Sequence, residues 1–387
     1  MPPEAQQMPT ETKKPSKLLK IILALIVLLV IAGLAAFAMR KQPGEGTQHS
    51  TGVTIKTIEL PTKFTEDYPD LKVQKGHYLL NSTGEESSDY ALNYDGNEVY
   101  EGSTTAVLSD NGLHYGYTVG TKKDSGIYID GKSVATIKSP QVTIQAVSDD
   151  GSQYIYTTSS ANANGEPVRN GLYRNKELLH TTKDWESIFS VKASGDLSAV
   201  MFNEGYECSH RGGGCGKFRL ILNGKVIDDG KQGGEYAMQS FDISQDGKQN
   251  IFTRANDDKN YKADLVVNGV EQGEYLRGGG DVYISNSGYF TFVGNQDGIF
   301  VSKVSEDGAY DNLRIYPVSP NGGDQISIND DASHTFLWYR NGNSNFGYAP
   351  SILQLDGNNL DYANKSDLKA AELDGNTLYL YLFKPAS

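Results

Sequence analysis

The chain has 387 residues and a formal net charge of −13 at pH 7. Residues 1–41 contribute +4 to this charge, which leaves −17 on the rest of the chain. So acidic a domain repels the phosphate backbone of DNA or RNA, and the composition therefore argues against a nucleic-acid partner.

The N-terminal region predicts a membrane anchor. Residues 1–20 are polar, and we expect a short cytoplasmic tail there. Residues 21–39 contain no charge and would rise about 28 Å as a helix, enough to span a hydrocarbon core. Four lysines precede this segment, against Arg40 and Lys41 after it, which favours a cytoplasmic N-terminus. A cleaved signal peptide is the alternative, because Ala36–Ala38 resembles a cleavage site.

The remaining chain divides into a stem and one domain. Residues 40–52 are rich in Gly, Thr and Ser and predict a flexible stem, and residues 53–387 then form the extracytoplasmic domain. Val53–Leu60 alternates and is expected to be the first strand. Pro61–Gly76 is expected to be a loop, and His77–Glu101 holds a partial repeat.

A short motif recurs from Leu108 onward. It has the form Ser-x-Asp-Gly, followed by alternating aromatic and β-branched residues. Its turn positions are Gly112, Gly151, Gly195, Gly247, Gly288 and Gly375, with Ala332 in the sixth place. Successive spacings run from 39 to 52 residues, which is typical of propeller blades.

A second turn signal runs in step with the first. Asn-Gly or Asp-Gly pairs stand between β-rich runs about half a period away, at Gly96, Gly131, Gly224, Gly269 and Gly357. Such pairs favour two-residue hairpin turns, which need positive φ. Two turns in each unit predict four antiparallel strands.

The pattern therefore predicts an all-β fold, a seven-bladed β-propeller behind a single transmembrane helix. The units resemble the TolB-type, WD40-like propeller repeats of bacterial envelope proteins over roughly Leu108–Phe383, although the proline which that family often has before the aspartate is missing from every copy. The resemblance implies the fold and carries over no partner or activity. We expect residues 376–384 to close the ring by pairing beside His77–Glu101.

The two cysteines, Cys208 and Cys215, stand in a Gly-rich stretch of the longest repeat. Outside the cytoplasm, cysteines at this spacing are typical of a disulfide. A metal site with His210 is an alternative, but the stretch does not supply enough ligands, and free thiols are the third possibility. We expect the disulfide, with no metal and no cofactor.

The sequence contains no H-E-x-x-H zincin motif, no G-x-S-x-G nucleophile elbow and no EF-hand loop. His114 and His334 fall two residues after the repeat turn, at a position that varies between units, so we expect a strand-surface position. The acidic pairs Asp149–Asp150, Asp257–Asp258 and Asp330–Asp331 are expected to cap turns through Asx-type hydrogen bonds. Calcium binding at these pairs is the alternative, without a ligand pattern behind it.

The functional expectation is a non-catalytic module that binds protein or glycan at the cell membrane, with the propeller on the extracytoplasmic side. The alternative is a propeller enzyme, a hydrolase or lyase, whose His, Asp or Glu side chains converge on the central channel. A sensor is least favoured, because residues 1–20 are short for a signalling domain.

Overall fold

The protein is described here from a computed structural model. The residues that it describes are 52–61, 70–83, 90–102, 104–121, 123–139, 141–161, 167–208, 215–230, 240–255, 262–276, 282–293, 298–304, 310–317, 325–340, 351–360 and 368–383. All of them belong to one compact unit, Ser50–Ser387.

The described residues form eight sheets, seven of four strands and one of three. Blade 1 consists of β2 Asp70–Gln74, β3 His77–Thr83, β4 Tyr90–Tyr94 and β5 Asn97–Glu101, and blade 2 of β6 Ala106–Leu108, β7 Tyr115–Gly120, β8 Ser125–Ile129 and β9 Lys132–Ile137. Blade 3 consists of β10 Val142–Val147, β11 Tyr154–Ala161, β12 Pro167–Arg174 and β13 Glu177–Thr181, and blade 4 of β14 Ser187–Ala193, β15 Val200–Cys208, β16 Cys215–Leu222 and β17 Lys225–Gly230.

Blades 5 to 8 continue in the same order. Blade 5 consists of β18 Phe241–Ile243, β19 Asn250–Ala255, β20 Lys262–Val267 and β21 Val270–Leu276, and blade 6 of β22 Tyr283–Ile284, β23 Tyr289–Val293, β24 Gly298–Val304 and β25 Tyr310–Pro317. Blade 7 consists of β26 Gln325–Ile328, β27 Thr335–Arg340, β28 Ser351–Leu355 and β29 Asn358–Asn359. Blade 8 is the three-stranded sheet of β30 Leu368–Asp374, β31 Thr377–Phe383 and β1 Thr54–Leu60. Each successive pair within a four-stranded sheet is antiparallel, as in β10, β11, β12 and β13.

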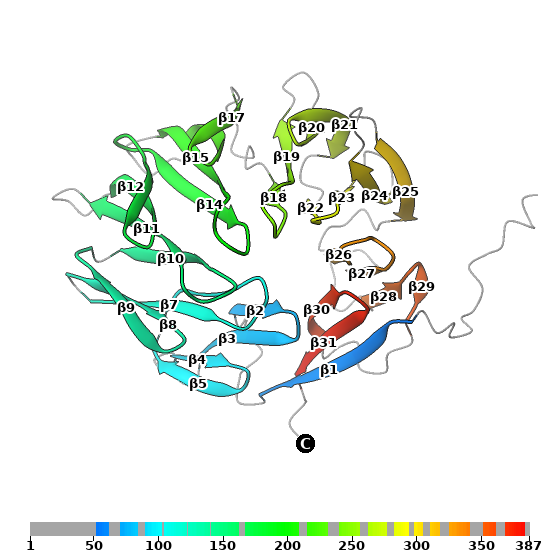
Figure 1. Ribbon diagram of the computed structural model, residues 1–387, viewed down its shortest axis with the longest axis horizontal. Coiled ribbons are helices and arrows are strands. Elements are labelled where there is room, and N and C mark those ends of the chain that lie inside the picture. Colours follow the sequence, from blue (N-terminus) through cyan, green and yellow to red (C-terminus); the bar gives the residue numbers. More distant parts are fainter. Residues whose placement is uncertain are drawn as a thin grey trace, which may run out of the picture. The chain divides into compact units, whose positions relative to one another are not determined.

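The sheets follow one another around a ring, and β2, β10, β14, β18, β22, β26 and β30 lie on its inner side (Figure 1). This arrangement confirms the β-propeller, but the expected number of seven blades is wrong. The segment predicted as a loop contains β2, whose D-L-K-V-Q pattern alternates as a strand should. A two-residue turn at Lys75 and Gly76, with φ of 48° and 89°, joins it to β3. The N-terminal repeat is therefore a complete blade, and the C-terminal fragment belongs to an eighth.

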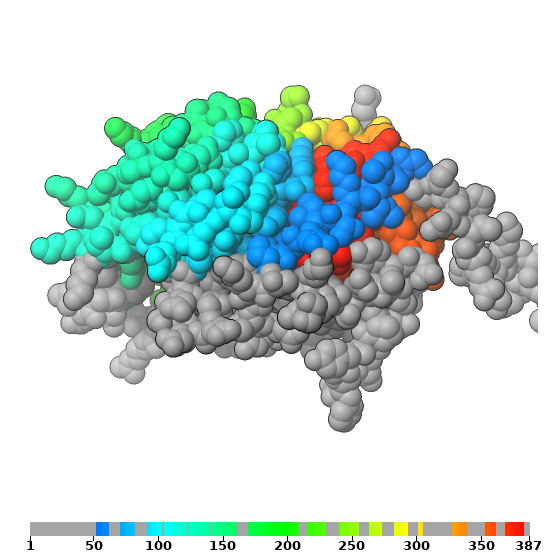
Figure 2. Space-filling model, turned by 90° about the horizontal axis from the view of Figure 1, so that it is seen from below, coloured from blue at the N-terminus to red at the C-terminus, as the bar shows by residue number. Residues whose placement is uncertain are grey.

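The eighth blade contains both the first and the last described strand. β1 pairs with β31 in parallel, from Thr54 opposite Thr377 to Leu60 opposite Phe383. Figure 2 shows the two strands side by side, β1 in blue and β31 in red. The expected pairing of residues 376–384 with the strands of His77–Glu101 is thus wrong, because β1 occupies the edge of β31.

The transmembrane helix expected at residues 21–39 is not seen. It lies outside the described residues, as do the tail at 1–20 and almost all of the stem at 40–52. No helix within the described part of the chain is long and apolar enough to cross a membrane.

Apolar side chains are buried between neighbouring blades. Ile127 on β8 and Ile144 on β10 belong to one cluster with Tyr154 and Tyr156 on β11, so blade 2 packs against blade 3. Alternating positions of each strand face such a cluster, which follows from the two-residue period of a strand. Tyrosines contribute much of this packing, as in the stacked Tyr117 and Tyr128, whose ring centroids are 5.0 Å apart. These clusters fix the rotation of each blade and thereby the direction of the side chains at the axis.

Candidate functional site

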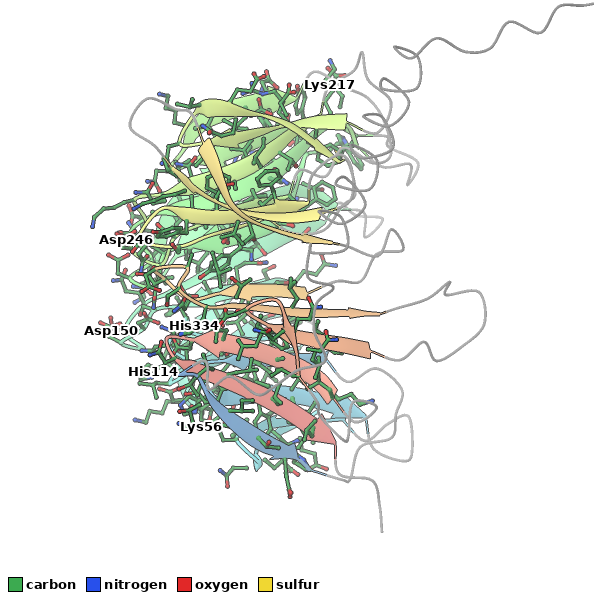
Figure 3. All side chains as sticks on the ribbon, turned by 90° about the vertical axis from the view of Figure 1, so that its right-hand side faces the viewer. Lys56, His114, Asp150, Lys217, Asp246 and His334 are labelled. Carbon is green, nitrogen blue, oxygen red and sulfur yellow. A yellow bond between two sulfur atoms is a disulfide. The ribbon has the colours of Figure 1, made fainter. Side chains whose placement is uncertain are left out.

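The Ser-x-Asp-Gly motif forms a self-capped turn between the first and second strands of a blade. In blade 3, the Ser148 hydroxyl donates to Asp150 Oδ1 at 2.6 Å and accepts from the Gln153 amide at 2.9 Å. Hydrogen bonds from Ser148 and Ser152 lower the pKa of Asp150 to about 2. Blades 4 and 5 repeat the Ser–Asp bond at 2.7 Å, from Ser194 and Ser244. Asp150 and Asp246 lie along the same face of the propeller, here named the turn face (Figure 3).

The turn glycines follow the expected pattern with one exception. Gly112, Gly151, Gly247, Gly288 and Gly375 have positive φ, and Ala332 has a φ of 52° in the sixth place. Gly195 does not hold this position in blade 4. Leu197 holds it instead, with a φ of 56°, because Ser194 and Asp196 set the phase of that turn. The turn predicted at Gly195 therefore lies two residues before its actual position in this unit.

The histidines after the turn are paired, which the sequence analysis missed. The Nδ1 atoms of His77, His114 and His334 lie 2.7–2.8 Å from a carboxylate oxygen of Asp95, Asp130 and Asp356 respectively. Each aspartate also accepts the backbone N–H that follows the histidine. Each His–Asp pair thus links the two turns of one blade. The sequence signal for the pair was a His after one turn together with an Asp at the other turn.

The residue between Ser and Asp in the motif reaches towards the neighbouring turns. Asp149 accepts from the Asn111 amide at 2.8 Å and from Gln245 Nε2 at 2.9 Å. The Gln245 carbonyl accepts from the Gly195 amide at 2.8 Å, and its side-chain oxygen lies 3.5 Å from Lys75 Nζ. Gln245 thereby joins turns of blades 1, 3, 4 and 5. Only one member of the pair Asp149–Asp150 caps its own turn; the other links blades.

A cavity of about 990 Å³ lies among the inner strands and turns at this face. Its ionisable lining comes from seven of the eight blades: Lys75, Asp110, Lys192, Asp242, Tyr283, Asp330, Glu372 and Asp374. Neutral polar side chains, among them Gln245 and Asn286, and several apolar residues also line it. The volume falls in the range of small-ligand and side-chain binding pockets. Because the turns of different blades converge here, groups far apart in sequence share one space.

The cavity has more carboxylates than cations. Among the described residues, five acidic side chains line it, against two lysines. Both lysines already have a partner, since Lys75 Nζ lies 3.8 Å from Asp374 and Lys192 Nζ lies 3.8 Å from Asp242. Asp110 forms no hydrogen bond or ion pair with the described residues. The lining therefore carries negative charge that its own lysines do not neutralise.

Burial shifts the protonation of two of these acids. Burial, together with the nearby Asp149 and Asp242, raises the pKa of Asp110 to about 6. Burial also raises the pKa of Glu372 to about 7, although that carboxylate accepts the Lys75 amide at 2.5 Å. Tyr283 lines the cavity, and the surrounding protein and carboxylates raise its pKa above the ordinary value. A cation placed among these three groups would stabilise their ionised forms.

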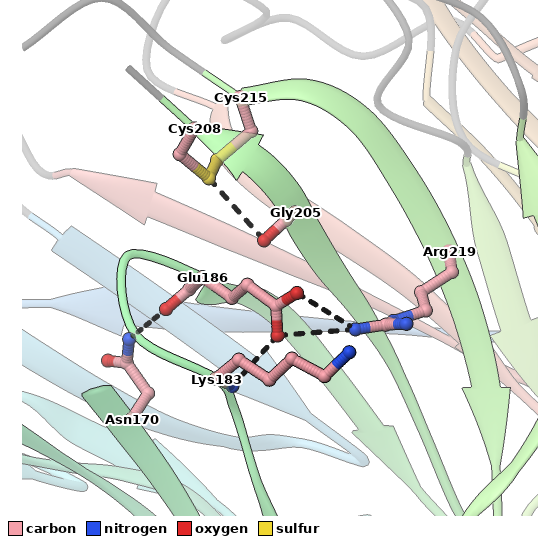
Figure 4. The surroundings of a disulfide bond; sticks show 7 residues. All are labelled: Asn170, Lys183, Glu186, Gly205, Cys208, Cys215 and Arg219. Carbon is pink, nitrogen blue, oxygen red and sulfur yellow. Dashed lines mark hydrogen bonds and ion pairs between the residues drawn. A yellow bond between two sulfur atoms is a disulfide. The ribbon is translucent and has the colours of Figure 1, made fainter. Parts of the chain in front are cut away.

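The expected disulfide is present, but it lies apart from this cavity. Cys208 and Cys215 are opposite each other at the ends of β15 and β16 and are bonded (Figure 4). Further along the hairpin, Arg219 binds Glu204 at 2.7 Å and Glu186 at 3.2 Å. His210 and the pair Asp257–Asp258 lie outside the described residues.

Within the described residues, no group of three or more His, Cys, Asp or Glu is placed to hold a metal ion. The acids of the cavity thus line a shared space without forming a coordination cluster. A signal for this site existed in the sequence, because the variable position of the motif is polar at Asp110, Asp149, Gln245, Asn286 and Asp330. It is visible only once the turns are known to converge.

Comparison with known proteins assigns the chain to no family. No protein-family model matches the chain, and no curated protein matches it either. Among solved structures, prolyl oligopeptidase B from Galerina marginata is similar over 80% of this chain and 53% of its own, with 13% identity and a TM-score of 0.45. A structure described as the eukaryotic initiation factor is similar over 82% of this chain and 91% of its own, with 11% identity and a TM-score of 0.40. TolB from Acinetobacter baumannii matches over 60% of this chain and 58% of its own, with 17% identity and a TM-score of 0.31, a resemblance at the level of the repeat.

Proposed function

We propose that the propeller is a non-catalytic binding module of the cell envelope, and that its central cavity receives a basic segment of a protein partner. The observation that carries this proposal is the charge of the cavity: five carboxylates, and two lysines that already have acidic partners. A Lys or Arg side chain entering the cavity would meet carboxylates partly withdrawn from water. Coulomb attraction is stronger there than between exposed groups.

Protonation should control this binding. The pKa of Asp110 is raised to about 6 and that of Glu372 to about 7, so both acids ionise fully only above neutral pH. Because a cation favours the ionised forms, the affinity for a basic segment should rise from pH 5 to pH 8. Its binding at pH 6 to 7 should release protons.

The test is equilibrium binding of short fluorescent peptides to the purified full-length chain. Peptides with alternating Lys or Arg should bind more tightly than the same sequence with Glu, and more tightly at pH 8 than at pH 5. The double substitution Asp110→Asn and Glu372→Gln should weaken binding and remove the pH dependence. Asp184→Asn, at an exposed acid on the surface, is the matched control. Equal affinity for basic and acidic peptides would refute the proposal.

The extracytoplasmic location is part of the proposal, and the disulfide supports it. Disulfides persist in oxidising compartments and are rare in the cytosol. Alkylation of unreduced cells should leave Cys208 and Cys215 unlabelled, whereas prior reduction should expose both thiols. Labelling without reduction would contradict this location. Attachment to the cell membrane stays a prediction of the sequence.

An enzyme working in the same cavity is the second candidate. The raised pKa values of Asp110 and Glu372 place two carboxyls in the range suited to proton transfer at neutral pH, and perturbed groups of this kind gather at catalytic sites. Turnover of a substrate that Asp110→Asn abolishes, while peptide binding is unchanged, would favour this candidate over the first.

A further inference from the structure

A second cavity differs from the first in place and in chemistry. It has a volume of about 490 Å³ and is lined by residues of blades 2, 3 and 4. Val142 at the start of β10 and Ile188 near the start of β14 belong to its lining, whereas the turn face lies at the ends of these strands. A strand of six residues is about 20 Å long. The two cavities therefore lie at opposite ends of the inner strands.

Among the described residues, the lining of this second cavity, here named the neutral pocket, contains no charged side chain. Its twelve residues include no Asp, Glu, Lys, Arg or His. Amide and hydroxyl groups dominate it, from Gln141, Thr143, Gln145, Thr158 and Ser159, with Phe189 beside them. This composition contrasts with a domain that is strongly acidic elsewhere.

Several of these polar groups have hydrogen-bonding capacity to spare. Among the described residues, the side chains of Gln141, Thr143 and Thr158 form no hydrogen bond. The Ser159 hydroxyl is shielded from water and has no hydrogen-bond partner in the described part of the chain. Gln145 uses its amide to donate to Thr157 Oγ1 at 3.1 Å, which leaves its carbonyl as an acceptor. Buried polar groups are normally paired, so the Ser159 hydroxyl indicates a ligand that supplies its partner. Gln141 is exposed and Thr143 and Thr158 are half-buried, so their side chains are accessible to the same ligand.

Phe189 supplies a rigid aromatic surface at the same pocket. Its ring is 45% exposed, and it stands edge-on to Phe218 with centroids 5.4 Å apart. It rests over Gly205, where an added Cβ would come within 2.5 Å of the ring and within 2.8 Å of the Cys215 sulfur. The disulfide closes the same hairpin (Figure 4). The backbone thus leaves room for this ring and holds it against the strand.

We propose that the neutral pocket binds an uncharged saccharide. A pyranose ring presents C–H groups that pack on the face of an aromatic ring, and hydroxyls that both donate and accept hydrogen bonds. Phe189 and the unpaired amides and hydroxyls match these two features. A phosphate or an acidic peptide would meet no cation among the described lining residues, and a lipid chain would leave the polar groups unpaired.

This site is independent of the cavity at the turn face and extends beyond the proposed function. The two sites have no described lining residue in common. Substitution at one should therefore leave the ligand of the other unaffected. Loss of saccharide binding and loss of peptide binding are separate outcomes that distinguish the two proposals.

The experiment is saturation-transfer NMR followed by calorimetry on the full-length chain. The probes are glucose, galactose, mannose, N-acetylglucosamine and their common disaccharides, with glucuronic acid as the charged comparison. At least one neutral probe should bind with a dissociation constant of about 1 mM or tighter, and more tightly than glucuronic acid. Phe189→Ala should weaken this binding about tenfold or more, and Phe189→Trp should retain it.

Two further variants keep the test decisive. Gln145→Ala should weaken binding about fivefold, because a hydrogen-bond partner of the sugar is lost. Leu178→Ala removes an equally exposed apolar side chain on β13, outside the lining, and should change nothing. The proposal is overturned if no neutral probe binds at about 10 mM, or if Phe189→Ala and Gln145→Ala bind as the unsubstituted chain does.

Discussion

Replacement of Asp110 by asparagine should stabilise the propeller at alkaline pH. Burial and the neighbouring Asp149 and Asp242 raise the pKa of Asp110 from 3.8 to about 6. The folded state therefore binds a proton more readily than the unfolded state, and ionisation at higher pH opposes folding. Asparagine has nearly the same size and cannot ionise, so it removes this opposition.

The magnitude follows from the shift. One pKa unit corresponds to about 1.4 kcal/mol, so a shift of about two units is worth up to roughly 3 kcal/mol at pH 8. Cavity water reduces this figure, and we expect a gain of about 2 kcal/mol. The penalty is absent below the unfolded pKa and develops as pH rises through the folded value. Asp110→Asn should thus gain stability at pH 8 and gain almost none at pH 4.

Urea denaturation at pH 4, 6 and 8, followed by tyrosine and tryptophan fluorescence, measures this gain. Asp184→Asn is the control, because that acid is exposed and paired with Arg169 on the surface. It should show no gain that grows with pH. Destabilisation by Asp110→Asn at pH 8, or a gain of equal size at pH 4, would refute the assignment of Asp110 to a desolvated cavity.

Three other predictions concern the fold. Serine at both Cys208 and Cys215 should lower the free energy of unfolding by roughly 2.5 kcal/mol, as chain entropy predicts for a loop of about eight residues, and unchanged urea denaturation would disprove it. Gly112→Ala should lower the free energy of unfolding by more than about 2 kcal/mol, because the added Cβ would clash with the Gln74 carbonyl. Gly269→Ala, at a similar φ but with open space around it, should lower it by only about 1 kcal/mol. Equal losses of stability would show that the turn of blade 2 does not pack on blade 1. Deletion of residues 376–387 removes β31, the partner of β1, and should abolish a single cooperative melting transition; unchanged melting would count against closure by this strand.

The turn chemistry made the propeller predictable from the sequence. Ser148 and Asp150 cap their turn with local hydrogen bonds, so the motif records the geometry directly. The turn position of Leu197 was not predicted because Gly195, two residues earlier, is the residue type expected there. Only the hydrogen bonds of Asp196 show where the turn lies. The eighth blade was missed because β2 lacks the motif and turns through Lys75 instead.

The cavity was less predictable for a physical reason. Asp149 and Asp150 are adjacent and chemically identical, yet one links neighbouring turns and the other caps its own. Which of them faces the axis depends on the rotation of each blade, which is set by packing between sheets. The neutral pocket is harder still, because Gln145 and Phe189 come from different blades and share no motif.

The most direct test of the central claim is site-specific photo-cross-linking in intact cells. A photoreactive amino acid in place of Tyr283, which lines the cavity, should capture one dominant protein, with the adduct in a segment rich in Lys or Arg. The adduct should diminish when Asp110→Asn and Glu372→Gln are introduced together. The same photoreactive residue in place of Leu178 is the control, since that side chain is exposed outside the cavity. Capture no greater than at position 178, or capture that survives neutralisation of both acids, would contradict a cavity that binds basic partners.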